Sequence, residues 1–209
     1  MNARWMLAAL LAIGCTRATA RRGLPYYTNR TLTPVWIDSI GARDTVHRIG
    51  DFTLVDQRGR TVGRATVAHR IYVASFFYAE CQQLCPKLRS QLQRVQAAFQ
   101  RDTNVMILSH TIAPEADSVS VLRRYATENH LDSNKWLLLT GARSEIERLA
   151  RDEYYVELRD SGGKTTGRLL HTETFALVDR DGHIRGLYDG SLSYDVSQLI
   201  DDIRTLERE

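Results

Sequence analysis

The sequence predicts an α/β domain built on a central mixed sheet with helices on its faces. Strand-like and helix-like segments alternate through the middle of the chain, and a hairpin pattern stands at each end of that alternation. The size agrees, because 209 residues suffice for one domain with a full core. A content of 43% hydrophobic and 25% charged residues is typical of globular proteins.

The spacing of apolar residues predicts the elements in order. Asp56–Gly59 is a turn between two short β-type runs, 52–55 and 61–63, which predicts a hairpin. The nearly continuous apolar run 70–78 predicts a central strand covered on both faces. The alternation that follows predicts strands at 105–108 and 136–139 and helices at 86–101, 118–130 and 144–155. Ser118 or Asp117 is expected to cap the second of these helices.

After residue 155 the alternation of strand-like and helix-like segments ends. Asp179–Gly182 joins the apolar runs 174–178 and 183–188, and an Asp-Gly turn between apolar runs is a strong hairpin signal. Apolar residues on one helical face of 194–209 predict a closing helix. Together these elements predict a thioredoxin-like fold with an N-terminal hairpin extension.

The N-terminus has the pattern of a targeting segment. Arg4 precedes the apolar run 5–13, which is far shorter than the roughly 20 residues of a spanning helix. Gly14 and Cys15 follow this run, and a cysteine directly after a small residue resembles the bacterial lipobox. A lipid on Cys15 would hold the domain at the bacterial envelope, facing the periplasm, without a span. The expected division is a signal peptide at 1–14, a lipidated tether at 15–45 and the globular domain at 46–209.

The charge pattern argues against a nucleic-acid partner. The formal net charge of +3 is weak and evenly spread, and no base-stacking motif accompanies it. Arg17, Arg21 and Arg22 directly follow the first apolar run, which favours a membrane-proximal linker over a nucleic-acid-binding arm.

The chain has three cysteines, and the anchor accounts for Cys15. Cys81 and Cys85 then remain in an oxidising compartment, where they predict a disulfide, a redox couple or a metal site. They fall in the loop after the strand 70–78 and at the start of the next helix, where open α/β sheets bind ligands. A helix N-terminus favours thiolate, which binds metal or attacks disulfides. Metal or redox chemistry is therefore favoured over a structural disulfide.

A copper site would need a third ligand, and His171 is the candidate. Two soft thiolates select Cu(I), and an added imidazole also accommodates Cu(II). His171 precedes the strand 174–178, and in a thioredoxin layout the loop entering that strand approaches the loop at the helix start. The alternative interpretation is that His171 is a structural residue held by hydrogen bonds and binds no metal. Structural zinc is disfavoured, because closed zinc sites use four ligands and only three candidates occur.

Other polar residues near these positions are weaker candidates. His110 ends a predicted strand and could line the site, although orienting a neighbour is favoured over ligation. Glu80 and Glu173 flank the predicted ligands and either tune the local charge or are solvated loop carboxylates. The remaining histidines have surface or turn contexts and are interpreted as non-functional: His47, His69, His130 and His183.

The motifs around these residues resemble the SCO/SenC family of copper chaperones. The resemblance runs in order through 24–27, 76–78, 81–87, 108–111, 114–117, 136–141, 171–175 and 179–185. It implies a thioredoxin fold, copper held by Cys81, Cys85 and His171, and a role in delivering copper to cytochrome c oxidase or in reducing its cysteines. The expected partner is the CuA-bearing subunit of the oxidase or another periplasmic copper protein. The chain departs from the family pattern at Gln82, where Pro is frequent, and at Ala113, where Asp is common.

Two function classes follow. The favoured one is a copper metallochaperone, which binds and transfers rather than catalyses. The alternative is a membrane-anchored thiol–disulfide oxidoreductase that uses Cys81 and Cys85. A redox couple needs only the cysteines, whereas copper binding also needs a histidine, so His171 within a matching motif favours copper. A peroxidase ranks third, because no motif for a polar pocket around one attacking thiolate is present.

Overall fold

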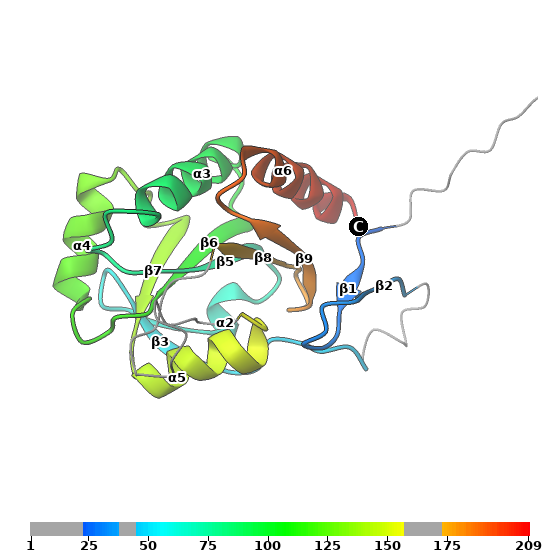
Figure 1. Ribbon diagram of the computed structural model, residues 1–209, viewed down its shortest axis with the longest axis horizontal. Coiled ribbons are helices and arrows are strands. Elements are labelled where there is room, and N and C mark those ends of the chain that lie inside the picture. The colour runs from blue at the N-terminus through cyan, green and yellow to red at the C-terminus, as the bar shows by residue number, and fades with distance from the viewer. Residues whose placement is uncertain (1–22, 38–44, 157–172) are drawn as a thin grey trace, which may run out of the picture.

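A computed structural model describes residues 23–37, 45–156 and 173–209. Within them a seven-stranded mixed sheet forms the centre of the molecule, with helices on both faces (Figure 1). The predicted α/β architecture is therefore confirmed. In sheet order the strands are β4 (Thr61–Gly63), β3 (Thr53–Asp56), β7 (Trp136–Thr140), β6 (Val105–Thr111), β5 (Ile71–Phe77), β8 (Thr174–Val178) and β9 (Ile184–Asp189).

β5 is the central strand that its apolar sequence predicts, and all seven of its residues are buried. It pairs in parallel with β6, which in turn pairs in parallel with β7. The carboxyl ends of these three strands therefore lie at one edge of the sheet, which we call the carboxyl edge. β8 runs antiparallel to both β5 and β9, so β9 is parallel to β5 and begins at the opposite edge.

The sheet has a hydrophobic core on each face. Alternate residues of β5 point to opposite faces, so Val73 belongs to one core and Tyr72 to the other. The first core is covered by α3 (Cys85–Ala98), α4 (Val119–Glu128) and α6 (Ser193–Arg208). The second is covered by α2 (Arg64–Val67), α5 (Arg143–Arg148) and the π-helical turn η1 (Leu149–Glu153).

Both predicted hairpins are present. β3 pairs antiparallel with β4, and β8 with β9. Gly59 and Gly182 occupy their turns at φ angles of 79° and 90°, which glycine adopts without the strain that a side chain would cause. Ser118 caps α4 as predicted, with its side chain accepting a hydrogen bond from the N–H of Val121.

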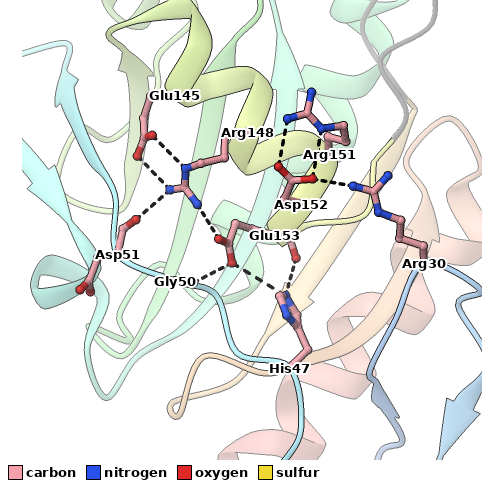
Figure 2. Close-up of polar contacts among 9 residues, drawn as sticks. All are labelled: Arg30, His47, Gly50, Asp51, Glu145, Arg148, Arg151, Asp152 and Glu153. Carbon is pink, nitrogen blue, oxygen red and sulfur yellow. Dashed lines mark hydrogen bonds and ion pairs between the residues drawn. The ribbon is translucent and has the colours of Figure 1, made fainter.

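The helix expected at 144–155 differs from the prediction, because α5 ends at Arg148 and continues as η1. Glu153 at the end of η1 is held by Arg148 of α5 and by two residues distant in sequence, His47 and Gly50 (Figure 2). Its carboxylate accepts hydrogen bonds from the N–H of Gly50 over 2.7 Å and from Arg148 over 2.5 Å. Its carbonyl oxygen lies 2.8 Å from Nε2 of His47. These long-range contacts coincide with the widened turn, which helical periodicity alone does not predict.

The N-terminal segment forms a small sheet of its own, with β1 (Tyr26–Tyr27) antiparallel to β2 (Pro34–Val35). Tyr26 is buried against the domain, so part of the segment expected to be a tether packs as structure. The expected domain boundaries stay predictions. Among the described residues, no helix combines the length and the apolar character needed to cross a membrane.

Candidate metal centre

Cys81 and Cys85 lie together at the carboxyl edge of the sheet, as their sequence positions predict. Cys81 sits in the loop after β5, and Cys85 is the first residue of α3. The N–H of Cys85 donates a hydrogen bond to Sγ of Cys81 over 3.3 Å. Both cysteines are reduced, and only 7% of Cys81 and 2% of Cys85 is exposed. The pair is therefore compact and shielded.

The start of α3 directs this arrangement. Leu84 occupies the N-cap position without a side-chain cap, and Pro86 stands in the first turn. A helix without a side-chain cap leaves its first N–H groups in need of acceptors. Sγ of Cys81 supplies one, which places that sulfur at the positive end of the helix dipole.

The two thiols differ in acidity because of this contact. Burial opposes ionisation of Cys81, but hydrogen bonds from the Cys85 thiol and from the N–H groups of Cys85 and Gln83 outweigh it and lower the pKa of Cys81. Burial, reinforced by the hydrogen bond to Cys81, raises the pKa of Cys85 to about 12. Cys81 is therefore the first thiolate, and Cys85 is the proton donor that stabilises it.

A wall of aromatic and polar side chains closes the site on the side of Cys85. A small cavity of about 20 Å³ lies between Cys85, Tyr125 and Trp136. Arg89 donates a hydrogen bond to the hydroxyl of Tyr125 over 3.1 Å, and its charge partly offsets the burial that raises the pKa of Cys85. Arg89 was not a sequence candidate, because an arginine on an amphipathic helix carries no distinguishing signal.

Asp117 is a positioning residue that the sequence reasoning treated only as a possible helix cap. It is buried, and its carboxylate accepts hydrogen bonds from the N–H of Ala79, over 3.1 Å, and from the hydroxyl of Thr111. Ala79 belongs to the loop that carries Cys81, so Asp117 ties this loop to the end of β6. Burial raises the pKa of Asp117, while the hydrogen bond from Thr111 opposes that rise.

His171, the predicted third ligand, lies outside the described residues. Within the part of the chain that is described, no group of three or more His, Cys, Asp or Glu side chains is arranged to hold a metal. β8 begins at Thr174 and runs antiparallel to β5, with Ala176 opposite Ala74. The chain therefore enters β8 at the carboxyl edge, where the cysteines lie. Glu80 and Glu173 are exposed.

His110 does not join the cysteines. It lies on the other face of the sheet, stacked on Phe76 with ring centroids 5.1 Å apart. Its Nδ1 is 3.2 Å from the carbonyl oxygen of Ser75, and its Nε2 has no hydrogen-bond partner among the described residues. Burial lowers the pKa of His110 to about 4 despite the Ser75 contact, so this ring is neutral at physiological pH.

The other histidines divide between surface and interior. His69 and His130 are exposed, and His47 is half-buried. His183 was assigned a surface or turn context, and the structure corrects the surface part: it follows a turn but is buried. Its Nδ1 lies 2.9 Å from the carbonyl oxygen of His47, a contact between residues too distant in sequence for the pattern to predict.

The order of these features along the chain agrees with a known family. The family model SCO1/SenC matches residues 41–208, which is most of the chain. The chain belongs to the SCO1/SenC family. Its SCO1/SenC relatives include the SCO1 protein homolog of Bacillus subtilis, 25% identical over 161 residues, with 76% of this chain and 82% of the relative covered. The mitochondrial SCO2 homolog of Bos taurus is 27% identical over 161 residues, covering 74% of this chain and 58% of that protein.

Solved structures of SCO1/SenC proteins share the fold. A SCO1/SenC family lipoprotein from Bacillus anthracis has a TM-score of 0.67 at 22% identity, over 77% of this chain and 95% of the other. Arabidopsis thaliana ScoI with copper bound has a TM-score of 0.62 at 22% identity, over 77% and 99%. The predicted thioredoxin-like fold is thereby confirmed.

Proposed function

We propose that this SCO1/SenC protein binds one copper ion through Cys81, Cys85 and His171 and acts as a copper chaperone in cytochrome c oxidase assembly. The observation that carries the proposal is the pair of reduced, adjacent thiols at the carboxyl edge of the sheet. The solved relatives from Arabidopsis thaliana and Bradyrhizobium japonicum that hold copper support it.

The donor set fits copper. Two thiolates are soft ligands that select Cu(I), and an imidazole also accommodates Cu(II). His171 precedes Thr174 by three residues, and three residues of extended chain span at most about 11 Å. Because Thr174 enters the sheet at the carboxyl edge, this tether is compatible with a histidine ligand beside the cysteines.

The two cysteines would become copper ligands in a defined order. Cys81 is the more acidic thiol and would offer the first sulfur ligand. Cys85 must lose its proton to become the second, so copper binding is coupled to proton release. Asp117 holds the loop that carries Cys81 during this change. The bound copper would be the cargo that is transferred to a partner such as the CuA-bearing subunit of the oxidase.

The rival proposal is a thiol–disulfide oxidoreductase. The unequal acidity of Cys81 and Cys85 favours it, because a redox couple needs one attacking thiolate and one resolving thiol. A solved relative described as containing a disulfide switch also keeps it open.

His171→Ala separates the two functions, because thiolate attack needs no imidazole ligand. If copper handling is the function, the variant keeps disulfide reductase activity but fails to support oxidase assembly in a host that lacks the gene. His130→Ala is the matched control, since His130 is exposed on another part of the surface. Normal oxidase assembly by His171→Ala would reject copper handling through this site and favour the oxidoreductase.

We further propose that the mature protein is a periplasm-facing lipoprotein anchored through Cys15. The lipobox-like Gly14-Cys15 pair supports this proposal, as does the Bacillus anthracis relative described as a lipoprotein. Mass spectrometry of protein extracted from membranes should find a lipid on Cys15 at the new N-terminus. A mature chain that retains Met1, or one without lipid, would refute the anchor.

A further inference from the structure

Exposed apolar side chains gather on the N-terminal hairpin. The large hydrophobic residues exposed within the described chain are Leu32, Val35, Trp36, Leu192 and Tyr194. Three of these five stand within one short stretch: Leu32 is 38% exposed, Val35 40% and Trp36 47%. Single exposed apolar residues are ordinary, but a contiguous group marks a surface that contacts something else. We call Leu32, Val35 and Trp36 the hairpin patch.

The turn that carries Leu32 is strained. Leu32 has a φ of 53°, a left-handed conformation that bulky residues rarely adopt, and its N–H donates to the carbonyl oxygen of Asn29 over 3.1 Å. Glycine would adopt this conformation without cost. The sequence instead has a leucine at this position, and its apolar side chain is partly exposed to solvent. Backbone strain of this kind often occurs at functional sites, so it indicates that Leu32 has a role other than stabilising the fold.

The hairpin is fixed firmly to the domain. Arg185 is buried and donates hydrogen bonds to the carbonyl oxygens of Leu24, over 2.7 Å, and Pro25, over 3.1 Å. Its guanidinium group also lies 4.0 Å from the ring centroid of Tyr26. At the other end of the hairpin, Arg30 forms an ion pair with Asp152. The patch is therefore presented in a defined orientation.

That orientation sets the patch away from the cysteines. Val35 is paired with Tyr26, whose ring lies 5.5 Å from the ring of His183, directly before β9. β9 begins at the edge opposite the carboxyl edge, where Cys81 and Cys85 lie. Figure 1 places β1 and β2 at one end of the molecule, beside the C-terminus. A surface covering the patch would leave the carboxyl edge of the sheet uncovered.

We propose that the hairpin patch rests on the membrane interface and orients the domain with its cysteines toward the aqueous side. The proposal relies on the lipid anchor at Cys15. Only seven residues lie between Cys15 and Gly23, where the described chain begins, and the eight steps from one to the other reach at most about 29 Å. Arg17, Arg21 and Arg22 in this segment favour anionic headgroups. Tryptophan is enriched at the membrane–water interface, which suits Trp36.

Tryptophan quenching in vesicles tests the proposal. The lipidated mature protein, which lacks residues 1–14 and therefore Trp5, is reconstituted into vesicles of phosphatidylglycerol and phosphatidylcholine, so that Trp36 and the buried Trp136 remain. We expect brominated acyl chains to quench Trp36, and acrylamide quenching to fall severalfold relative to detergent solution. The control is the same lipidated protein with Trp36→Phe and Tyr194→Trp, which moves the reporter to a site 79% exposed in the wild type.

Each outcome decides the proposal. Bromolipid quenching of Trp36 but not of the reporter at position 194 supports it. Protein that floats with the vesicles while Trp36 stays open to acrylamide overturns the hairpin contact and leaves the anchor intact. Protein that does not float overturns both. Shielding of Trp36 only after native membrane proteins are added would also overturn it, because the patch would then bind protein.

Discussion

The N–H of Cys85 donates a hydrogen bond to Sγ of Cys81 over 3.3 Å, so a sulfur atom caps the first turn of α3. The burial of Cys85, the hydrogen bond between the two thiols and this contact together make the neighbouring cysteines chemically unequal. Cys81 gains stabilisation as a thiolate, whereas Cys85 is held as the protonated donor. A ligand pair with one ready thiolate can capture a soft metal ion first and complete its shell by releasing a proton.

Alkylation should reveal this inequality. In the reduced, metal-free protein, iodoacetamide should modify Cys81 before Cys85 near neutral pH, because only the thiolate reacts. The Cys81 rate should rise with pH through a pKa below the ordinary value of 9.0, while Cys85 stays slow up to about pH 12. Peptide mapping by mass spectrometry measures both rates. Equal rates in the folded protein, as expected only after unfolding, would contradict the assignment.

Removing the Asp117 carboxylate should loosen the loop that carries Cys81. Asp117→Ala leaves the N–H of Ala79 and the hydroxyl of Thr111 without their acceptor, which should lower the free energy of unfolding by about 1–3 kcal/mol. Urea denaturation measures the change. Glu128→Ala, at an exposed position, is the control and should stay within about 0.5 kcal/mol of the wild type. If both variants unfold alike, Asp117 does not tie down this loop.

Protonation of His110 should contribute to acid unfolding. Its pKa falls from 6.5 to about 4 on folding, so the unfolded state binds the proton first as the pH drops. The contribution of His110 to stability is complete above pH 6.5 and is lost as the pH falls toward 4, by about 3 kcal/mol in total. As the pH falls over this range, the free energy of unfolding of the wild type should therefore decrease relative to that of His110→Leu.

Denaturant unfolding at several pH values measures that difference. His130→Gln is the control, because His130 is exposed and its removal should leave the pH dependence unchanged. A wild-type-minus-variant difference that is constant between pH 6.5 and 4 would show that His110 already titrates normally in the folded protein.

The fold was predictable where local pattern and burial agree. The run 70–78 is apolar throughout and became the fully buried β5, and the Asp-Gly turn before His183 became a hairpin. The prediction ended β6 too early, at Leu108, because its last three residues are polar. Their side chains are buried all the same, with the hydroxyls of Ser109 and Thr111 hydrogen-bonded to Ser75 and Asp117. Such partners come from other elements and leave no local signal.

The candidate site was predictable to a smaller extent. The spacing of Cys81 and Cys85 after a buried strand placed both thiols at the carboxyl edge. Their unequal acidity was not predictable, because it depends on the burial of Cys85 and on the hydrogen bonds between the two cysteines. Arg89 and Asp117 also act through tertiary contacts, with Tyr125 and with Ala79. The role of His171 rests on the family resemblance and stays a proposal.

Copper binding by the purified protein tests the central claim most directly. Cu(II) is added to wild type, His171→Ala and Cys81→Ser, and X-ray absorption counts the sulfur and nitrogen donors around the metal. We predict one copper per chain with two sulfurs and at least one imidazole nitrogen in the wild type. His171→Ala should lose Cu(II), and Cys81→Ser should lose tight binding in either oxidation state. Unchanged stoichiometric binding by either variant would contradict a copper site built from Cys81, Cys85 and His171.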